Sequence, residues 1–229
     1  MIRASISRIR HRGKPSQPAP KAQSFVEFAI FLPIFLMIFS GLVELGFFLN
    51  QYLNILDGAR EAARYYSDGD PKKRDLTGAD CSTTLDFYKQ AACLVAKTIY
   101  PVRFDAGKDD VVISVIGVAN HTRTYRWPSP PNDPAPYPET NGEWHLFGRG
   151  GACDPDTDDT CHPALTNAEI DAKLGSAPNT GIIVVEVFYN YHQVLSLPWI
   201  TLFLKDPVKM HVYAIMPISA AEPTATPIP

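Results

Sequence analysis

The sequence lacks the short motifs that mark common catalytic sites. Its 229 residues contain no G-x-S-x-G nucleophile elbow, no G-x-x-x-x-G-K-[ST] phosphate loop and no H-E-x-x-H zinc motif. The histidines, which could act as general bases, are scattered along the chain at His11, His121, His145, His162, His192 and His211. We therefore expect ordinary surface or core roles for them, in a protein that is not an enzyme and needs no cofactor.

Acidic residues are absent from the first 22 positions. That segment carries six basic residues, namely Arg3, Arg8, Arg10, Arg12, Lys14 and Lys21. Removing them leaves 15 basic residues against 24 acidic ones in the rest of the chain. A basic tail can serve nucleic acid, anionic lipid or membrane orientation, but an acidic main body argues against nucleic acid as a partner.

Charge is also missing from a long apolar run. Phe25–Leu49 contains 25 residues, of which only Glu27 and Glu44 are charged. As a helix this run is about 37 Å long, enough to cross a hydrocarbon core of about 30 Å, so membrane lipid is an expected partner. The uncharged part, Phe28–Val43, reaches only about 24 Å. At least one of the glutamates must therefore lie near or within the membrane boundary.

The run is consistent with an uncleaved anchor or with a cleaved secretory signal. The apolar region of a signal is about half this length and ends in a small-residue A-x-A site. Here Phe39-Ser40-Gly41 is followed by the further apolar sequence LVELGFFL, which favours the anchor. Because Lys and Arg are retained on the cytoplasmic side, we expect residues 1–22 in the cytoplasm, one pass through the inner cell membrane, and the remaining chain outside.

Apolar residues continue at helical spacing beyond the run. From Leu49, the last residue of the run, they are Leu53, Leu56 and Ala63, and the pattern breaks at Asp68-Gly69-Asp70-Pro71. The pattern predicts one helix over residues 23–66, whose second half emerges into water as a stalk. Pro33 lies inside the membrane span and has no amide hydrogen to donate, which predicts a kink there.

The helix region resembles a known family. The matching features, in order, are Glu27-Phe28-Ala29, Leu32-Pro33, Glu44-Leu45-Gly46 and Ala59-Arg60-Glu61-Ala62-Ala63-Arg64. They resemble the signature region of TadE-like proteins, the pseudopilins of tight-adherence (Flp) pilus systems, over about 44 of the 229 residues. The resemblance implies a role in assembling or anchoring a pilus or secretion machine. It also implies other pilus subunits and the assembly platform as partners.

The resemblance further implies processing by a prepilin peptidase, which cuts five positions before a glutamate. Mapped onto this chain, the cut falls between Ala22 and Gln23, with Ala22 in place of the usual glycine, and Glu27 is the glutamate. The new amine at Gln23 would suit Glu27 of a neighbouring subunit. In the alternative interpretation, Glu27 sits in the headgroup region near Lys21. Glu44 is expected at the outer interface of the membrane.

Two functions of different classes remain open. In the first, the chain is a minor pilin-like assembly subunit; in the second, the helix is only a tether for an external binding or adhesion module. Small residues in helical register, such as Gly58 and Ala59, favour helix packing over a passive tether. The candidate helix-packing residues are Pro33, Glu44, Gly58, Ala59, Arg60 and Arg64.

The rest of the chain predicts an external α+β domain over residues 67–220. Residues 84–100 have the spacing of an amphipathic packing helix, and residues 111–118, 182–191 and 208–216 are rich in β-branched and aromatic side chains. Together they indicate helices on one face of an antiparallel sheet with at least three strands. Residues 128–179 are predicted to be a long irregular insertion, and residues 221–229 a Pro/Thr-rich tail.

The four cysteines all lie on the predicted external side, which fits an oxidising compartment. Pairing by proximity would join Cys81 to Cys93 and Cys153 to Cys161, which is one of three connectivities. Residues 153–162, CDPDTDDTCH, also resemble the opening of a calcium loop. They lack the glycine at the sixth position and the distant glutamate, and a zinc site there would lack a fourth ligand. We therefore expect disulfides and no metal.

Overall fold

The computed structural model describes residues 21–73, 80–119, 122–127, 144–147, 165–174, 180–202 and 204–219. The chain divides into two compact units, Met1–Leu42 and Val43–Pro229. Helix α1, Lys21–Tyr65, begins in the first unit and ends in the second, followed by the 3-10 turn η1, Tyr66–Asp68. The predicted helix and its end near Asp68 are confirmed, as is the α+β fold class.

In the N-terminal unit α1 exposes large apolar side chains on all sides. Phe25, Phe31 and Phe35 are each more than half exposed. Burying such side chains is strongly favourable, so a helix that exposes them around its whole surface suits lipid better than water. By length and composition α1 can cross a membrane, and no residue of its most apolar window is buried within the chain. The helix continues through Pro33.

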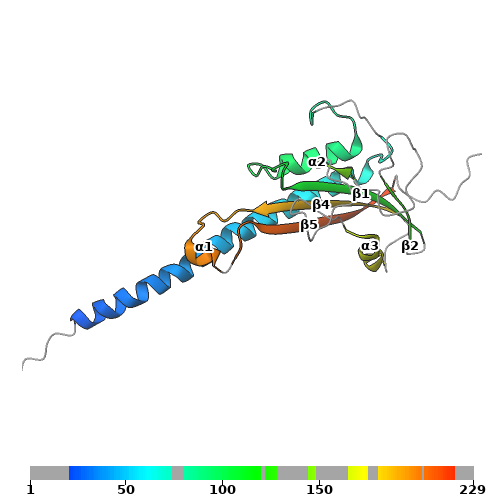
Figure 1. Ribbon diagram of the computed structural model, residues 1–229. Helices are drawn as coiled ribbons and strands as arrows, with labels where there is room; N and C mark the ends of the chain where they lie inside the picture. The colour runs from blue at the N-terminus through cyan, green and yellow to red at the C-terminus, as the bar shows by residue number, and fades with distance from the viewer. Residues whose placement is uncertain are drawn as a thin grey trace, which may run out of the picture. The chain divides into compact units, whose positions relative to one another are not determined.

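The domain unit, Val43–Pro229, is built on one antiparallel sheet (Figure 1). Its strands are β1 (Asp110–Ala119), β2 (Thr122–Trp127), β3 (Trp144–His145), β4 (Gly181–Tyr191) and β5 (Val208–Ile218). The order is β2-β1-β4-β5, and β3 also pairs with β1. The three predicted strands are confirmed as β1, β4 and β5, and β2 and β3 are additional.

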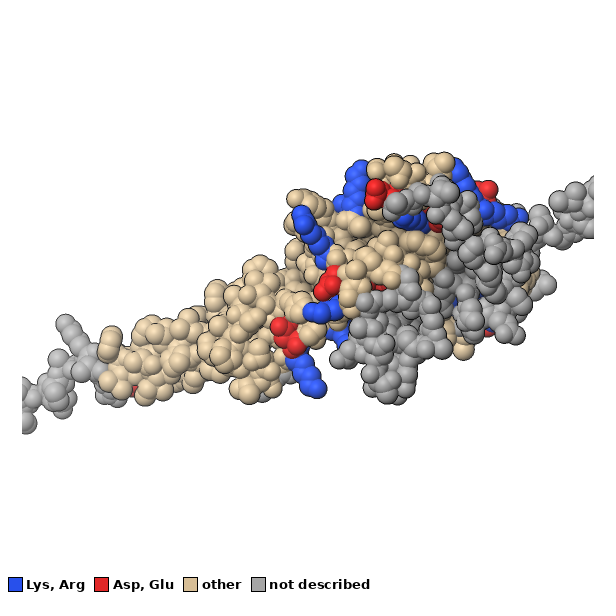
Figure 2. Space-filling model, turned by 45° about the horizontal axis from the view of Figure 1, so that its top comes forward, with Lys and Arg blue, Asp and Glu red and all other residues tan. Residues whose placement is uncertain are grey.

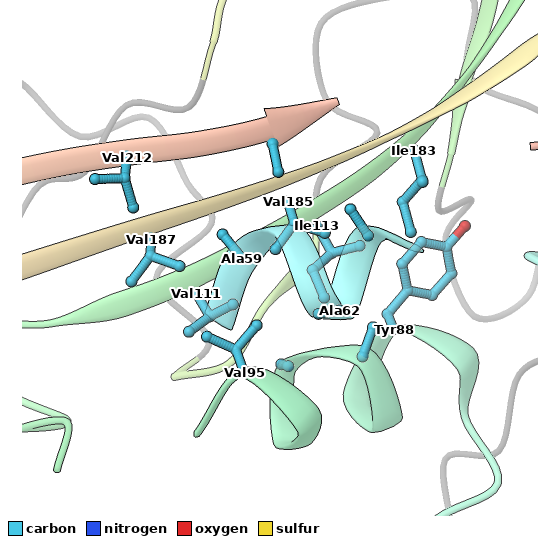
Figure 3. Close-up of a cluster of buried hydrophobic side chains, with 14 of the residues drawn as sticks. Ala59, Ala62, Tyr88, Val95, Val111, Ile113, Ile183, Val185, Val187 and Val212 are labelled. Atoms are coloured by element: carbon cyan, nitrogen blue, oxygen red, sulfur yellow. The ribbon is translucent and has the colours of Figure 1, made fainter. Parts of the chain in front are cut away.

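One face of the sheet packs against α1 and α2 (Phe87–Thr98). Figure 3 shows the contact, with Ala59 and Ala62 of α1 among the valines and isoleucines of β1, β4 and β5. Ile55, Ala59, Ala62 and Ala63 have no exposed surface. The prediction of a solvated stalk is therefore wrong, because this half of α1 supplies part of the domain core. Small side chains at helical spacing make a flat helix face that lies close to the sheet.

The opposite face of the sheet carries a second, smaller cluster. Helix α3, Asn167–Lys173, packs Ile170 and the following Leu174 against Ile116, Val118 and Val184. Strand β3 and helix α3 both fall within residues 128–179, so that range is not wholly irregular. The remaining predictions for the range, including the cysteine pair Cys153 and Cys161, lie outside the described residues, as do residues 1–20 and 221–229.

Helix α2 begins at a side-chain cap. Asp86 Oδ1 accepts hydrogen bonds from the backbone amides of Tyr88 at 3.0 Å and Lys89 at 3.1 Å. This cap explains why α2 starts at Phe87 rather than at residue 84. The disulfide Cys81–Cys93 joins the segment before α2 to its middle, which confirms that pairing.

Candidate functional site

Glu44 is the most unusual side chain of α1. It is the second residue of the domain unit and directly follows the uncharged stretch Phe28–Val43. Only 4% of its surface is exposed, although a buried carboxylate is costly unless donors satisfy it. Its partners therefore decide whether this position is tolerated.

Three donors satisfy the Glu44 carboxylate, all from the end of β4 and the residues after it. Oε1 accepts hydrogen bonds from the Tyr191 hydroxyl at 2.7 Å and from the Val194 amide at 2.9 Å. Oε2 accepts one from the Leu195 amide at 2.8 Å. Short bonds to an ionised acceptor are among the stronger hydrogen bonds in proteins. Glu44 thus joins α1 to a segment about 150 residues later in the chain.

Tyr191 is held in place to donate to Glu44. It is buried at the end of β4, and its ring meets that of Phe48 edge to face at 5.4 Å. Phe48 lies one helical turn after Glu44, on the same side of α1. Burial, and then the hydrogen bond to Glu44, raise the pKa of the Tyr191 hydroxyl. The hydroxyl therefore stays protonated, and remains a donor, throughout the physiological range.

The chain that follows Tyr191 forms a closed loop with its own internal bonds. The side-chain Nε2 of Gln193 donates to the Leu204 carbonyl at 2.9 Å, and the backbone amide of Gln193 donates to Asp206 Oδ1 at 3.2 Å. Ser196 adopts a positive φ of 44° and donates from Oγ to the Gln193 carbonyl at 2.8 Å. The short helix α4, Pro198–Thr201, lies between these closing contacts. The loop therefore has a defined shape and two ends held together.

Gly58 and Ala59, two of the predicted helix-packing residues, lie inside the domain unit. A Cβ added at Gly58 would lie 2.5 Å from Ile99 Cγ2, so glycine allows α1 to approach the end of α2 closely. Ala59 is buried in the core beside it. The small residues thus pack within their own chain, Gly58 against the end of helix α2 and Ala59 in the domain core.

The charged residues of the predicted set face outward. Arg60 and Arg64 are exposed, and Arg60 pairs with Asp57 at 3.7 Å between two exposed side chains. Glu27 and Pro33 are exposed in the N-terminal unit. Ala22 and Gln23 lie within the backbone of α1, and their side chains are outside the described part of the chain. The processing site therefore stays a prediction.

A second group of buried polar side chains lies on the sheet and was missed in the sequence. Arg126, with no exposed surface, donates to the Leu165 carbonyl at 3.0 Å and to Ser114 Oγ at 3.2 Å. Glu186 accepts from the Leu165 amide at 3.0 and 2.9 Å and lies 2.9 Å from His211 Nε2. The backbone N–H and C=O of Leu165 are thus both held. The signal was a single glutamate within the apolar strand IIVVEVFYNY.

Asp110 and His145 form a further buried pair. His145 Nδ1 lies 2.7 Å from Asp110 Oδ2 and joins β3 to the start of β1. Within the described ranges, no three His, Cys, Asp or Glu side chains are grouped so that they could hold a metal ion. These buried polar groups act on backbone segments, and their geometry suits a structural role.

The fold and the Glu44 site define an α+β domain built around the second half of an apolar, membrane-competent helix. Compared with known families, residues 22–64 match the family model described as TadE-like protein. The match confirms the resemblance, and its limits nearly coincide with those of α1, Lys21–Tyr65. The family suggests a Tad pilus-associated, pseudopilin-like protein. No curated protein and no solved structure matches the chain.

Proposed function

We propose that the chain is a membrane-anchored minor pilin-like subunit that takes part in assembling a Tad pilus or a related secretion machine. One observation carries the proposal. The family match over residues 22–64 takes in the whole of the apolar helix, Glu44 and the core-forming residues of α1. The family's signature is thus the element on which this fold is built.

The division of α1 limits where other subunits would contact it. From Ile55 to Ala63 its small and apolar side chains are used by the chain's own sheet and α2. In the N-terminal unit the apolar side chains are exposed, so they are available to lipid or to the helices of other subunits. We therefore assign helix packing with pilus subunits and the assembly platform to residues 24–42.

Orientation is a further part of the proposal. Six basic residues precede the apolar run, and such residues are retained on the cytoplasmic side of a membrane. The Cys81–Cys93 disulfide supports an oxidising compartment for the domain unit. We assign the first 22 residues to the cytoplasm and the domain to the outside of the inner membrane.

The proposed role is structural rather than enzymatic. The buried polar side chains described above hold backbone segments together, as Arg126 and Glu186 do at Leu165. Glu44 likewise fixes a loop to α1. These contacts supply rigidity to a domain that would meet other subunits.

Deletion of the chromosomal gene in the native host tests this function. We expect surface pili to be lost and to return on complementation with the full chain. A matched variant in which a cleavable signal replaces residues 1–42 should export the domain without restoring pili, because it lacks the helix that other subunits contact. Immunoblots of the domain serve as the expression control.

Two results would count against the proposal. Normal numbers of pili in the deletion strain would exclude a required assembly role. Normal pili combined with poor attachment of the cells to surfaces would instead favour an anchored adhesion module, in which the helix is only a tether.

A further inference from the structure

The loop that Glu44 holds exposes apolar side chains to an unusual degree. Residues 194–204, which we call the β4–β5 tip, read VLSLPWITLFL and contain no charged residue. Leu202 is 81% exposed, Val194 59% and Leu204 52%. A group of exposed apolar side chains in one place marks an interaction surface, whereas apolar side chains exposed singly are normal.

This exposure does not come from a loose loop. Ser196 Oγ and Gln193 Nε2 close the tip through bonds to the Gln193 and Leu204 carbonyls. With the tip closed in this way, Val194, Leu202 and Leu204 stay exposed, while Ile200 is buried. The tip is therefore a built feature with a fixed apolar surface.

The tip is fixed to α1 at the position where the uncharged run ends. The Val194 and Leu195 amides both donate to Glu44, and Figure 1 shows the orange α4 segment beside α1. On α1 itself, Leu45 and Leu49 follow Glu44 and are also exposed. Exposed apolar residues of α1 thus follow within five positions of the residue that holds the tip.

The membrane depth of Glu44 follows from the length of the run before it. Phe28–Val43 reaches about 24 Å as a helix, less than a hydrocarbon core of about 30 Å. If the inner end of this run lies at the inner boundary, then Glu44 and the groups bonded to it lie about 24 Å across the core, within about 6 Å of the outer boundary. Polar and charged side chains reappear on either side of the tip, at His192 before it and at Lys205 and Asp206 after it.

We propose that the β4–β5 tip enters the outer interface of the bilayer, and that lipid is what covers its apolar surface. The protein would then contact the membrane twice, through the α1 span and through the tip. Trp199, a residue type enriched at membrane interfaces, lies in α4 within the tip. The inference rests on the membrane-anchoring part of the proposed function and is independent of its pilus part.

Lipid fits this surface better than a soluble protein partner. On the face shown in Figure 2, the charged side chains gather over the domain unit while the apolar part of α1 shows none of the blue Lys or Arg atoms. A soluble partner would have to bind at the level where α1 leaves the membrane. The Glu44 bonds hold the tip at that level of α1, where Leu45 and Leu49 are exposed as well.

A fluorescent amino acid placed at single positions of the full chain tests the proposal. The chain is reconstituted into liposomes of phosphatidylethanolamine and phosphatidylglycerol, with or without bromine on the lipid acyl chains. The probe replaces Leu202 in the tip, Leu36 in the span, or Arg64 on the outer part of α1. Arg64 lies 20 residues beyond Glu44, about 30 Å along the helix, and is exposed to solvent.

We expect brominated lipid to quench the probe at Leu202 and at Leu36, and to leave the probe at Arg64 unquenched. Quenching at Leu36 without quenching at Leu202 would overturn the tip proposal and leave the anchor intact. A blue-shifted but unquenched probe at Leu202 would also overturn it, because a protein such as a second copy would then cover the tip. Failure of quenching at Leu36 would overturn the membrane anchor itself.

Discussion

At the scale of single residues, Glu44 of α1 holds the chain after β4 through three hydrogen bonds. Replacing it with alanine would leave the amides of Val194 and Leu195 and the hydroxyl of Tyr191 without their acceptor. A buried donor left unsatisfied costs about 1–3 kcal/mol. We expect Glu44→Ala to lower the free energy of unfolding of the full chain in detergent micelles by at least about 2 kcal/mol.

Tyr191→Phe is the matched control for Glu44. It removes one donor and leaves both amide bonds to the carboxylate, so the expected loss is about 1 kcal/mol. Urea unfolding followed by circular dichroism measures both variants. Equal and small losses for the two would show that the carboxylate does not hold the loop.

Gly58 gives a second prediction for a single residue. Gly58→Ala would place a methyl group 2.5 Å from Ile99 Cγ2, and the helices would have to separate or Ile99 to change rotamer. We expect a loss of about 1–3 kcal/mol, which is typical of overpacking. Gly46→Ala is the control, because nothing lies within 4 Å of its added Cβ and alanine favours the helix. A gain in stability from both variants would contradict the close packing.

The sequence singled out Glu44 but not its partners. A lone carboxylate at the edge of an apolar run can be recognised in the sequence. Tyr191, Val194 and Leu195 are about 150 residues away in the chain and come near it only in the folded structure. The alanines and glycine of α1 show the same limit. Their spacing predicted helix packing but not the element they would pack against, because a flat helix face suits α2 and the sheet of its own chain as well as another helix.

Among the elements, helix α2 depends on the cap at its start. Asp86→Ala removes the acceptor for the Tyr88 and Lys89 amides, and we expect it to lower the free energy of unfolding by about 1–2 kcal/mol. Asp86→Asn keeps a side-chain oxygen that can accept the same bonds, so it should lose less. Thermal or urea unfolding measures the difference. Equal losses for the two variants would show that the cap bonds contribute little.

The long strands were predictable and the short ones were not. Strands β1, β4 and β5 have continuous or alternating β-branched runs, so their composition marks them. Strand β2 reads TRTYRW and β3 only WH, which carry no such pattern. Helix α3 did have a readable signal, because Thr166 and Glu169 form a capping box in which each side chain bonds the other's amide.

For the whole molecule, the main finding is that one helix belongs to two units. The sequence predicted its length and its apolar run, but placed the boundary between anchor and domain at residue 66. The structure places the boundary at Leu42, because Ile55 to Ala63 are needed to cover the sheet. The domain unit therefore contains the C-terminal half of the apolar helix.

Processing of the N-terminus is a prediction for the whole chain. If a prepilin peptidase cuts between Ala22 and Gln23, protein purified from the native host should begin at Gln23. The intact-protein mass would then lack the first 22 residues. Glu27→Gln should leave the mass of the cut form unchanged apart from the substitution, yet weaken assembly, if Glu27 pairs with the new amine. An intact Met1 or Ile2 in all molecules would contradict processing.

The central claim, that the span is an assembly element and not a passive tether, is tested most directly by crosslinking in living cells. A photoreactive phenylalanine analogue replaces Phe31, an exposed residue of the span, or Tyr65, an exposed residue at the end of α1 in the domain unit. We predict that Phe31 yields adducts with another single-pass subunit of the pilus system, identified by mass spectrometry, and that Tyr65 does not yield the same adduct. If Phe31 gives adducts with lipid alone while pili are being assembled, the claim is contradicted.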